Sequence, residues 1–101
     1  MSLNLTNIYF IQNENGDIKI GRSIEVENRV DQLQIANSNN LKILYVIENM
    51  TPTFETFLHL ICQQYHLQGE WYHFNCIKFL LRHEFYKQNM LLYKSNKNKT
   101  R

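Results

Sequence analysis

The chain has 101 residues, of which 44% are hydrophobic and 13% aromatic, and its formal net charge is +2 at pH 7. This length and composition predict one folded domain with one small core and exclude a disordered chain, and the weak basic balance permits a nucleic-acid partner without requiring one. Because we find no apolar run long enough to span a membrane, no signal peptide and no zinc-like spacing of Cys62 and Cys76, we expect a soluble, cytoplasmic protein with reduced thiols.

The first predicted elements are the two strands of a β-hairpin around Asn15-Gly16. The runs IYFIQ (8–12) and IKI (18–20) are rich in strand-forming residues, and Asn-Gly between such runs is a strong hairpin signal. A three-residue loop, with Gly16 left-handed, puts the apolar side chains of both strands on one face, whereas a two-residue loop splits them. That face holds Ile8, Phe10, Ile18 and Ile20, and the other holds Tyr9, Ile11, Lys19 and Gly21. Because apolar faces set strand register, we predict the three-residue loop, which pairs residue 11 with residue 19.

A helix is predicted next, from Ile24 to Ala36, with Ser23 at the N-cap. Its apolar stripe consists of Val26, Val30 and Leu33, which recur at helical spacing. Arg29 lies inside this stripe, either as a functional side chain or as an arginine that packs its apolar stem on the edge of the core. A polar run ends the helix, and LKILYVI (41–47) predicts a third, half-buried strand.

Two further helices are predicted in the second half of the chain. Thr51 suits the N-cap of the first and Pro52 its first position. Its buried stripe is predicted to comprise Phe54, Phe57, Leu58, Ile61 and Tyr65. At roughly 100° per residue, a second stripe lies about a quarter turn away and comprises Glu55, His59, Cys62 and His66. The last helix has Asn75 as its N-cap, and its core side comprises Ile77, Leu80, Leu81 and Phe85.

This order of elements predicts an α+β fold, in which helices flank a small three-stranded antiparallel sheet made of the hairpin and residues 41–47. We assign residues 1–93 to this single domain. Residues 94–101 carry Lys94, Lys97, Lys99 and Arg101 without an acidic residue. They are predicted to form a flexible basic tail that either serves solubility or contacts phosphate.

Taken singly, the polar residues of these elements have structural as well as functional interpretations. Glu55 could be a first-turn glutamate that favours the helix dipole, and Tyr9 could be a cross-strand packing aromatic. Lys19 and Arg22 could be solvated charges. The stripe from Glu55 to His66 contains zinc-ligand types, but one straight helix spreads them over about 16 Å, too far to reach a single ion.

The motifs and their order resemble the phage-type branch of the GIY-YIG nuclease superfamily. Asn7-Ile8-Tyr9 corresponds to the first motif and Lys19-Ile20-Gly21 to the second, and Arg29 follows eight residues after that glycine. Glu55, His59 and the run Gly69-Glu70-Trp71-Tyr72 complete the resemblance, which covers residues 7–74. Asn7 replaces a glycine and Lys19 a tyrosine of the superfamily pattern. Cys62 and His66 replace an aromatic residue and an arginine of the branch.

The resemblance implies a phosphodiester-cleaving site built from Tyr9, Lys19, Arg29, Glu55 and His59. Glu55 is expected to hold Mg²⁺ or Mn²⁺, and Arg29 to clamp the scissile phosphate. Tyr9 is expected to orient or deprotonate the attacking water, and Lys19 to lower the pKa of that tyrosine or contact phosphate. His59 is expected to assist Glu55 or to shuttle a proton. The further candidates for DNA contact are Arg22, His66, Lys94 and Lys97.

We therefore expect a Mg²⁺-dependent DNA endonuclease of phage or viral type, with low intrinsic sequence specificity. The basic tail, a second copy of the chain, or a host or viral protein partner would have to supply specificity. The alternatives are a DNA- or protein-binding module that keeps the fold without turnover, and a host-directed viral inhibitor. The nuclease hypothesis requires Tyr9, Lys19, Arg29 and Glu55 to gather around one patch.

Overall fold

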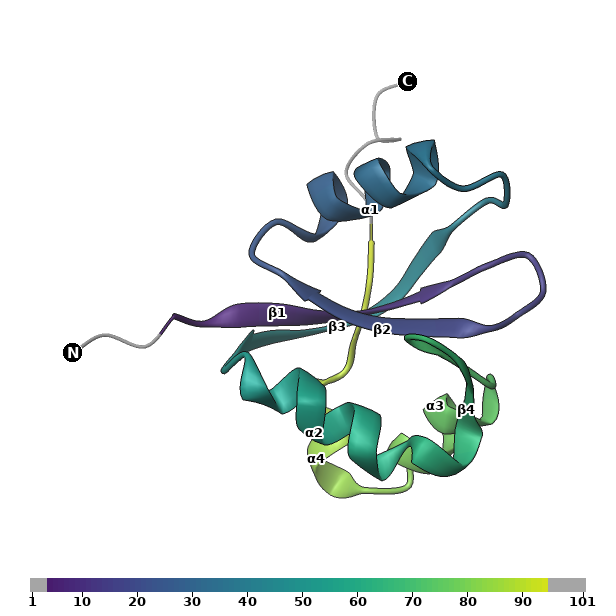
Figure 1. Ribbon diagram of the computed structural model, residues 1–101. Helices are drawn as coiled ribbons and strands as arrows, with labels where there is room; N and C mark the ends of the chain where they lie inside the picture. The colour runs from purple at the N-terminus through teal and green to yellow at the C-terminus, as the bar shows by residue number, and fades with distance from the viewer. Residues whose placement is uncertain (1–3, 95–101) are drawn as a thin grey trace.

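An antiparallel sheet of six strands runs through the part of the chain that the computed structural model describes, residues 4–94 (Figure 1). The strands lie in the order β4-β5-β2-β1-β3-β6. Their bounds are β1 Thr6–Gln12, β2 Ile18–Ser23, β3 Lys42–Met50, β4 His66–Gln68, β5 Trp71–Tyr72 and β6 Leu91–Leu92. The helices are α1 Val26–Ile35, α2 Thr53–Ile61, α3 Asn75–Leu80 and α4 Glu84–Asn89, with a short 3-10 turn, η1, at Gln63–Tyr65.

The predicted α+β class is confirmed, but the prediction of a three-stranded sheet is wrong. β2, β1 and β3 form the predicted centre, and three short strands extend it, because β5 pairs with β2, β4 with β5, and β6 with β3. Each added strand has only two or three residues. Runs this short carry no measurable periodicity, so a sequence pattern does not reveal them.

The predicted register of the β1–β2 hairpin is confirmed. Ile11 lies opposite Lys19, and Gly16 has a φ of 89°, in the left-handed region that glycine adopts without strain. The side chain of Asn13 closes the turn, since its Oδ1 accepts two backbone N–H groups of the loop at 3.0 and 2.9 Å. The turn therefore places the side chains of β1 and β2 on the faces that the apolar alternation predicts.

Helices cover both faces of the sheet, with α1 on one side and α2, α3 and α4 on the other (Figure 1). The side chains of β1 and β2 consequently divide between two cores. The core on the α1 side contains Tyr9, Ile11, Val26, Val30 and Val46. The larger core on the α2 side includes Ile8, Phe10, Ile18, Ile20, Ile47, Leu58, Cys62, Tyr72, Cys76, Ile77 and Leu80. Because both faces are covered, polar side chains of the central strands need an open sheet edge to meet a ligand.

The first helix, α1, begins two residues later than predicted and buries Val26 and Val30 as the apolar stripe indicates. Ser23 does not cap it, since its Oγ accepts the N–H of Glu25 at 3.0 Å in a turn that precedes the helix. Arg29 lies between the buried Val26 and Val30 in the sequence and is exposed. The Arg29 side chain can therefore contact a ligand from solvent, whereas the buried Val26 and Val30 cannot.

The second helix, α2, differs from its prediction in length and in its buried face. It ends at Ile61, and Pro52 rather than Thr51 occupies the N-cap. Cys62, predicted on the polar stripe, is fully buried, whereas Phe57, predicted to be buried, is 49% exposed. His66 lies in β4, so the predicted polar stripe of four residues along one helix is wrong. The chain leaves the helix too early to carry it.

The last predicted helix is two short helices, α3 and α4. His83 has an extended backbone, with φ of −102° and ψ of 137°, and this breaks the helical path between them. Ile77 and Leu80 are buried as predicted, but Phe85, on the second helix, is 42% exposed. None of the helices between residues 4 and 94 combines the length and apolarity needed to cross a membrane.

The chain returns to the sheet after α4, where β6 pairs with β3. The predicted domain boundary at residue 93 follows directly and stays a prediction. Lys94 is exposed. Lys97 and the rest of the predicted basic tail lie outside the described residues.

Candidate functional site

The outer edge of β2 is open where the candidate residues approach one another. β5 pairs with only the first two residues of β2. At Ile20 the N–H donates to the Glu70 carbonyl at 3.3 Å, and the Ile20 carbonyl accepts from His59 Nε2 at 3.0 Å. Beyond this point no described strand pairs with the outer edge. Arg22 is exposed at this end of the strand, whereas Gly21, although its outer edge is unpaired, is buried.

Tyr9 reaches this edge because its cross-strand neighbour is a glycine. It lies opposite Gly21, and a Cβ atom added at Gly21 would stand 2.4 Å from both Cζ and Oη of the tyrosine. The phenol ring thus fills the space above β2 that a side chain would otherwise occupy. Since no other residue permits this approach without a shift of the ring, Gly21 sets the position of the Tyr9 hydroxyl.

Charged groups from three segments act on that hydroxyl. Burial raises the pKa of Tyr9 above its ordinary value of 10.0, a side-chain hydrogen bond with Arg29 and its positive charge lower it, and the charges of Glu70 and Glu55 raise it. Arg29, rather than Lys19, is therefore the cation that opposes the effect of burial. Tyr9 is protonated at neutral pH, so its hydroxyl can donate a hydrogen bond to an anion or orient a water molecule.

The raised tyrosine pKa values predict a loss of stability at alkaline pH. Burial raises the pKa of Tyr9, Tyr72 and Tyr86 above 10.0. The folded protein therefore holds these protons more tightly than the unfolded chain, so this stabilising contribution is complete below the unfolded value of 10.0 and is lost as pH rises through the folded values. We expect the free energy of unfolding in urea to decline above about pH 10. The decline should be smaller in Tyr9→Phe, and an unchanged decline would contradict the assignment to Tyr9.

Lys19 shares the α1 side of β2 with Tyr9, but its charge is compensated. Its Nζ lies 3.0 Å from Glu70 Oε1 and 5.7 Å from the centre of the Trp71 ring. Its side chain is only 17% exposed, so the lysine needs a rearrangement before it can contact a phosphate. No role was predicted for Glu70 from the sequence, although this residue belongs to the Gly69-Glu70-Trp71-Tyr72 run that contributes to the resemblance.

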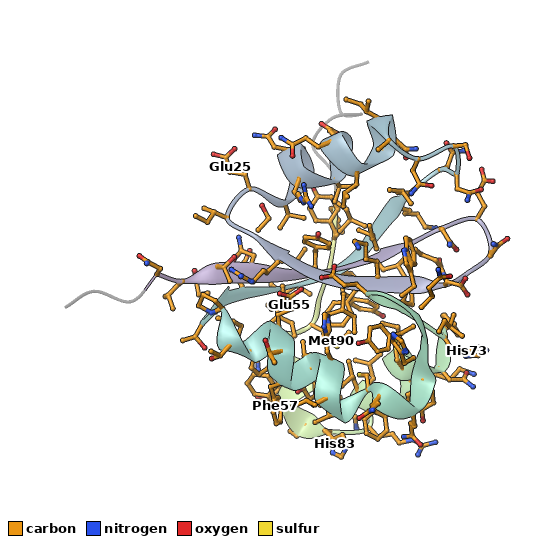
Figure 2. The ribbon with its side chains drawn as sticks, in the orientation of Figure 1. Glu25, Glu55, Phe57, His73, His83 and Met90 are labelled. Carbon is orange, nitrogen blue, oxygen red and sulfur yellow. The ribbon has the colours of Figure 1, made fainter. Side chains whose placement is uncertain are left out.

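Glu55 approaches the same strand from the other side of the sheet. It lies in the first turn of α2, and Figure 2 shows it between that helix and the sheet. Its Oε1 accepts a hydrogen bond from Arg22 Nε at 3.0 Å, and its Oε2 lies 3.7 Å from His59 Nε2. The Glu55 side chain is 14% exposed and that of Arg22 is 49% exposed. A largely buried carboxylate is thus held by a cation that extends into solvent.

The prediction that Tyr9, Lys19, Arg29 and Glu55 gather around one patch on one face is wrong. The residues form two groups on opposite sides of β2, and a shared site requires one ligand to reach both groups at the edge of the strand. Tyr9 belongs to the core on the α1 side, whereas Ile20, which binds His59, belongs to the core on the α2 side. The cause is the strand's alternation, which sends successive side chains to opposite faces. The charges of Arg29 and Glu55 nevertheless both act on the pKa of the Tyr9 hydroxyl.

The other candidates for DNA contact differ in their relation to this edge. Arg22 contacts Glu55 directly. His66 lies in β4, where its Nε2 is 2.8 Å from the Gly69 carbonyl and its ring centre 5.3 Å from that of Tyr72. Lys94 lines a surface pocket formed with residues of β3, β6 and α1. This pocket contains none of the residues predicted to be catalytic, so the structure does not bring Lys94 to the edge of β2.

Glu55 is the residue from which the sequence predicts a divalent-cation site. Within residues 4–94 no group of three or more His, Cys, Asp and Glu side chains could hold a metal ion. The protein would therefore supply a single carboxylate. A hard cation such as Mg²⁺ suits this arrangement, because it keeps several waters and is commonly bound through one or two carboxylates together with substrate phosphate. Glu55 fits such a cation, but Arg22 now occupies its Oε1.

Comparison with known protein families gives a match over most of the chain. The model of a family described as "T5orf172 domain" matches residues 6–89. This span runs from β1 to the end of α4 and includes both groups of residues at the edge of β2. No curated protein and no solved structure matches the chain.

Proposed function

The chain belongs to the T5orf172 domain family, and from this premise we propose that it is a divalent-metal-dependent nuclease that hydrolyses DNA phosphodiester bonds. The domain is found in phage and nuclease-like proteins, which supports a nuclease or DNA-binding role. Membership of the GIY-YIG superfamily is part of the proposal. The order of the elements supports it: a hairpin comes first, then a helix that carries Arg29, and then a helix that carries Glu55. The motifs that resemble those of the superfamily lie on these elements in the same order.

The observation that carries the proposal is the environment of the Tyr9 hydroxyl. The Tyr9 side chain is 2% exposed, and its pKa is lowered by Arg29 and raised by the charge of Glu55, although Glu55 lies on the other face of the sheet. Gly21 has no side chain to separate the two groups. A phosphodiester lying along the open edge of β2 could therefore meet an arginine, a hydroxyl and a carboxylate at once.

Each of these residues has a defined task in the proposed hydrolysis. Arg29 neutralises charge on the phosphoryl oxygens through its guanidinium fork. Tyr9, being protonated, orients the attacking water or donates to a phosphate oxygen, which favours the orienting role over that of a general base. Glu55 would hold Mg²⁺ or Mn²⁺, and the bound cation would stabilise negative charge on the reacting phosphate. His59 is a positioning residue, since its ring is anchored by the Ile20 carbonyl beside Glu55.

The direct test is a nicking assay with supercoiled plasmid and the full chain. We expect nicking in Mg²⁺ or Mn²⁺ and no nicking after the cation is removed with EDTA. EDTA added after the reaction should leave the nicked plasmid nicked. This result would show that the metal is needed for cleavage itself and does not merely alter how the plasmid migrates in the gel. Nicking that persists unchanged in EDTA would show that a carboxylate-bound cation has no part in the reaction.

Replacing Arg29 with lysine should lower the rate of nicking by about tenfold to a hundredfold, the value of a charge-assisted hydrogen bond. Lysine keeps the charge but loses the planar pair of donors. The measurement is the initial rate of nicking, together with the apparent pKa of Tyr9 followed by phenolate absorbance. Replacement of the exposed Arg82 by lysine serves as the control, since it makes the same change beyond the edge of β2. Equal rates in the two variants would remove Arg29 from the site.

A DNA-binding module without turnover is the second candidate. It is favoured by the internal pairing of the cations nearest the site, because Arg22 is bound to Glu55 and Lys19 to Glu70. Such a module would bind plasmid in a salt-sensitive manner without nicking it in any divalent cation. The same assay therefore decides between the two candidates.

A further inference from the structure

We propose that Arg22 changes partner when the site is loaded: a divalent cation takes Glu55, and the released guanidinium binds a DNA phosphate. Cation and DNA would then bind with positive coupling. This inference rests on the proposed function and deepens it, because it assigns to one residue the link between the metal site and the nucleic-acid site.

The ion pair is built so that the arginine, and not the glutamate, can leave. The Arg22 side chain is 49% exposed, whereas that of Glu55 is 14% exposed and lies against α2 and the sheet. The pair has one short contact, between Arg22 Nε and Glu55 Oε1 at 3.0 Å. An ion pair of which one member is half exposed adds little stability, because solvent competes for the guanidinium. Its separation therefore carries a small energetic cost.

A divalent cation bound to Glu55 would be repelled by the Arg22 guanidinium in its present position. Arg22 Nε lies 3.0 Å from Oε1, and the other oxygen, Oε2, lies 3.7 Å from His59 Nε2. Both oxygens belong to one carboxylate, so a cation at either of them would stand close to the guanidinium. Like charges at such separations repel strongly. Binding of the cation must consequently displace Arg22, unless the cation binds elsewhere.

The displaced guanidinium has one favourable destination. Arg22 lies on the open part of the β2 edge, beyond the end of the pairing with β5, on the strand where the proposed phosphate lies. An arginine fork matches phosphate geometry and remains charged at any pH of interest. The exchange replaces one anionic partner by another, so Arg22 does not become an unpaired charge. A DNA phosphate and the cation therefore favour each other's binding.

The contrasting interpretation is a static pair, in which Arg22 permanently orients Glu55. The two interpretations make opposite predictions for Arg22→Gln. With exchange, removal of the competing charge raises the affinity for the cation. With a static pair, removal of the orienting charge lowers that affinity. Glutamine lacks the guanidinium carbon and the terminal nitrogens of arginine, but its Nε2 stands where Arg22 Nε contacts Glu55, so the variant removes the charge and keeps a donor at that position.

The first measurement is the binding of Mn²⁺ to the full chain without DNA, followed by the electron paramagnetic resonance signal of the free ion. We expect Arg22→Gln to bind Mn²⁺ about threefold to fivefold more tightly than the wild type, the range that partly exposed ion pairs allow. Arg22→Lys should show a smaller increase or none, because it keeps the charge. The control Arg82→Gln, which removes a charge from an exposed residue between α3 and α4, should match the wild type.

The second measurement is the affinity for a short fluorescent DNA duplex with and without Ca²⁺, with the duplex checked for intact length afterwards. In the wild type, Ca²⁺ should tighten DNA binding by about fivefold or more, a typical coupling between two sites. In Arg22→Gln the ratio of DNA affinities with and without Ca²⁺ should fall towards one. The slope of the logarithm of affinity against the logarithm of salt concentration should decrease in magnitude by about one, which corresponds to the loss of one phosphate contact. The control Arg82→Gln should keep the wild-type gain.

The outcomes separate this inference from the proposed function. Weaker Mn²⁺ binding in Arg22→Gln, or an undiminished gain from Ca²⁺, would overturn the exchange of partners while leaving the metal site at Glu55 intact. The variant Glu55→Gln tests that site itself, because it should bind Mn²⁺ far more weakly than the wild type. If it binds equally well, the proposed metal site and the exchange both fail.

Discussion

Replacing Glu55 with glutamine should lower Mg²⁺-dependent nicking by about a thousandfold, the equivalent of several kcal/mol of transition-state stabilisation. Glutamine has the same shape, but it lacks the charge that attracts a hard cation. Within residues 4–94 no group of three or more potential ligands stands ready to replace it. The measurement is the initial rate of plasmid nicking over a series of Mg²⁺ concentrations. A loss that high Mg²⁺ restores would indicate a weakened metal site rather than a missing base.

The same variant should remain folded. The Arg22–Glu55 pair is half exposed at the arginine, so its removal should change the free energy of unfolding by less than about 1 kcal/mol. Thermal unfolding followed by circular dichroism provides this check. The matched control is Glu84→Gln, because Glu84 also lies in the first turn of a short helix but away from β2. A similar loss of nicking in both variants, or nearly full activity in Glu55→Gln, would contradict the assignment.

Replacing Gly21 with alanine should both destabilise the protein and impair cleavage. The new Cβ would stand 2.4 Å from the Tyr9 ring, so either the ring or the β2 backbone must move. Overpacking of this kind typically costs about 1–3 kcal/mol, measurable by urea unfolding. A displacement of the Tyr9 hydroxyl by about 1 Å can lower the rate by about a hundredfold. Unchanged stability and activity would show that Tyr9 does not depend on this close approach.

A second substitution identifies the ring as the cause. In a Tyr9→Leu background the phenol is absent, so Gly21→Ala should lose most of its destabilising effect, and the two substitutions should be strongly non-additive. Gly16→Ala is the control for stability alone. Gly16 has a φ of 89°, so alanine there is strained by about 1–2 kcal/mol, but the hairpin loop lies away from the site. It should therefore lose stability and keep the wild-type nicking rate.

Because helices cover both faces of the sheet, the proposed site lies at an edge of β2. Tyr9 is 2% exposed although it is proposed to meet a ligand, and Glu55 is nearly buried beneath the other face. If β2 were paired along its whole outer edge, the sheet would separate Tyr9 on one face from Glu55 on the other. The early end of the β5 pairing leaves a place where groups from both faces can act on one ligand. The short added strands thus shape the site as well as the sheet.

Local patterns in the sequence determined the central part of the fold. The Asn-Gly turn and the apolar alternation around it predicted the register that pairs Ile11 with Lys19. The spacing of Val26 and Val30 likewise predicted the buried face of α1. These features depend on neighbours a few residues apart, whose turn and helix preferences are strong. The spacing of the polar motifs also selected Tyr9, Arg29 and Glu55 as candidates, and their roles stay predictions.

Only the tertiary structure decided which of these side chains share a face and which charges are already paired. The contact between Arg22 and Glu55 joins residues 33 positions apart, and the partner of Lys19 is a glutamate from the segment before β5. The burial of Cys62 and the exposure of Phe57 depend on how α2 rests on the sheet. Such contacts arise from the packing of distant segments and from a strand's alternation between two covered faces, which no local preference encodes.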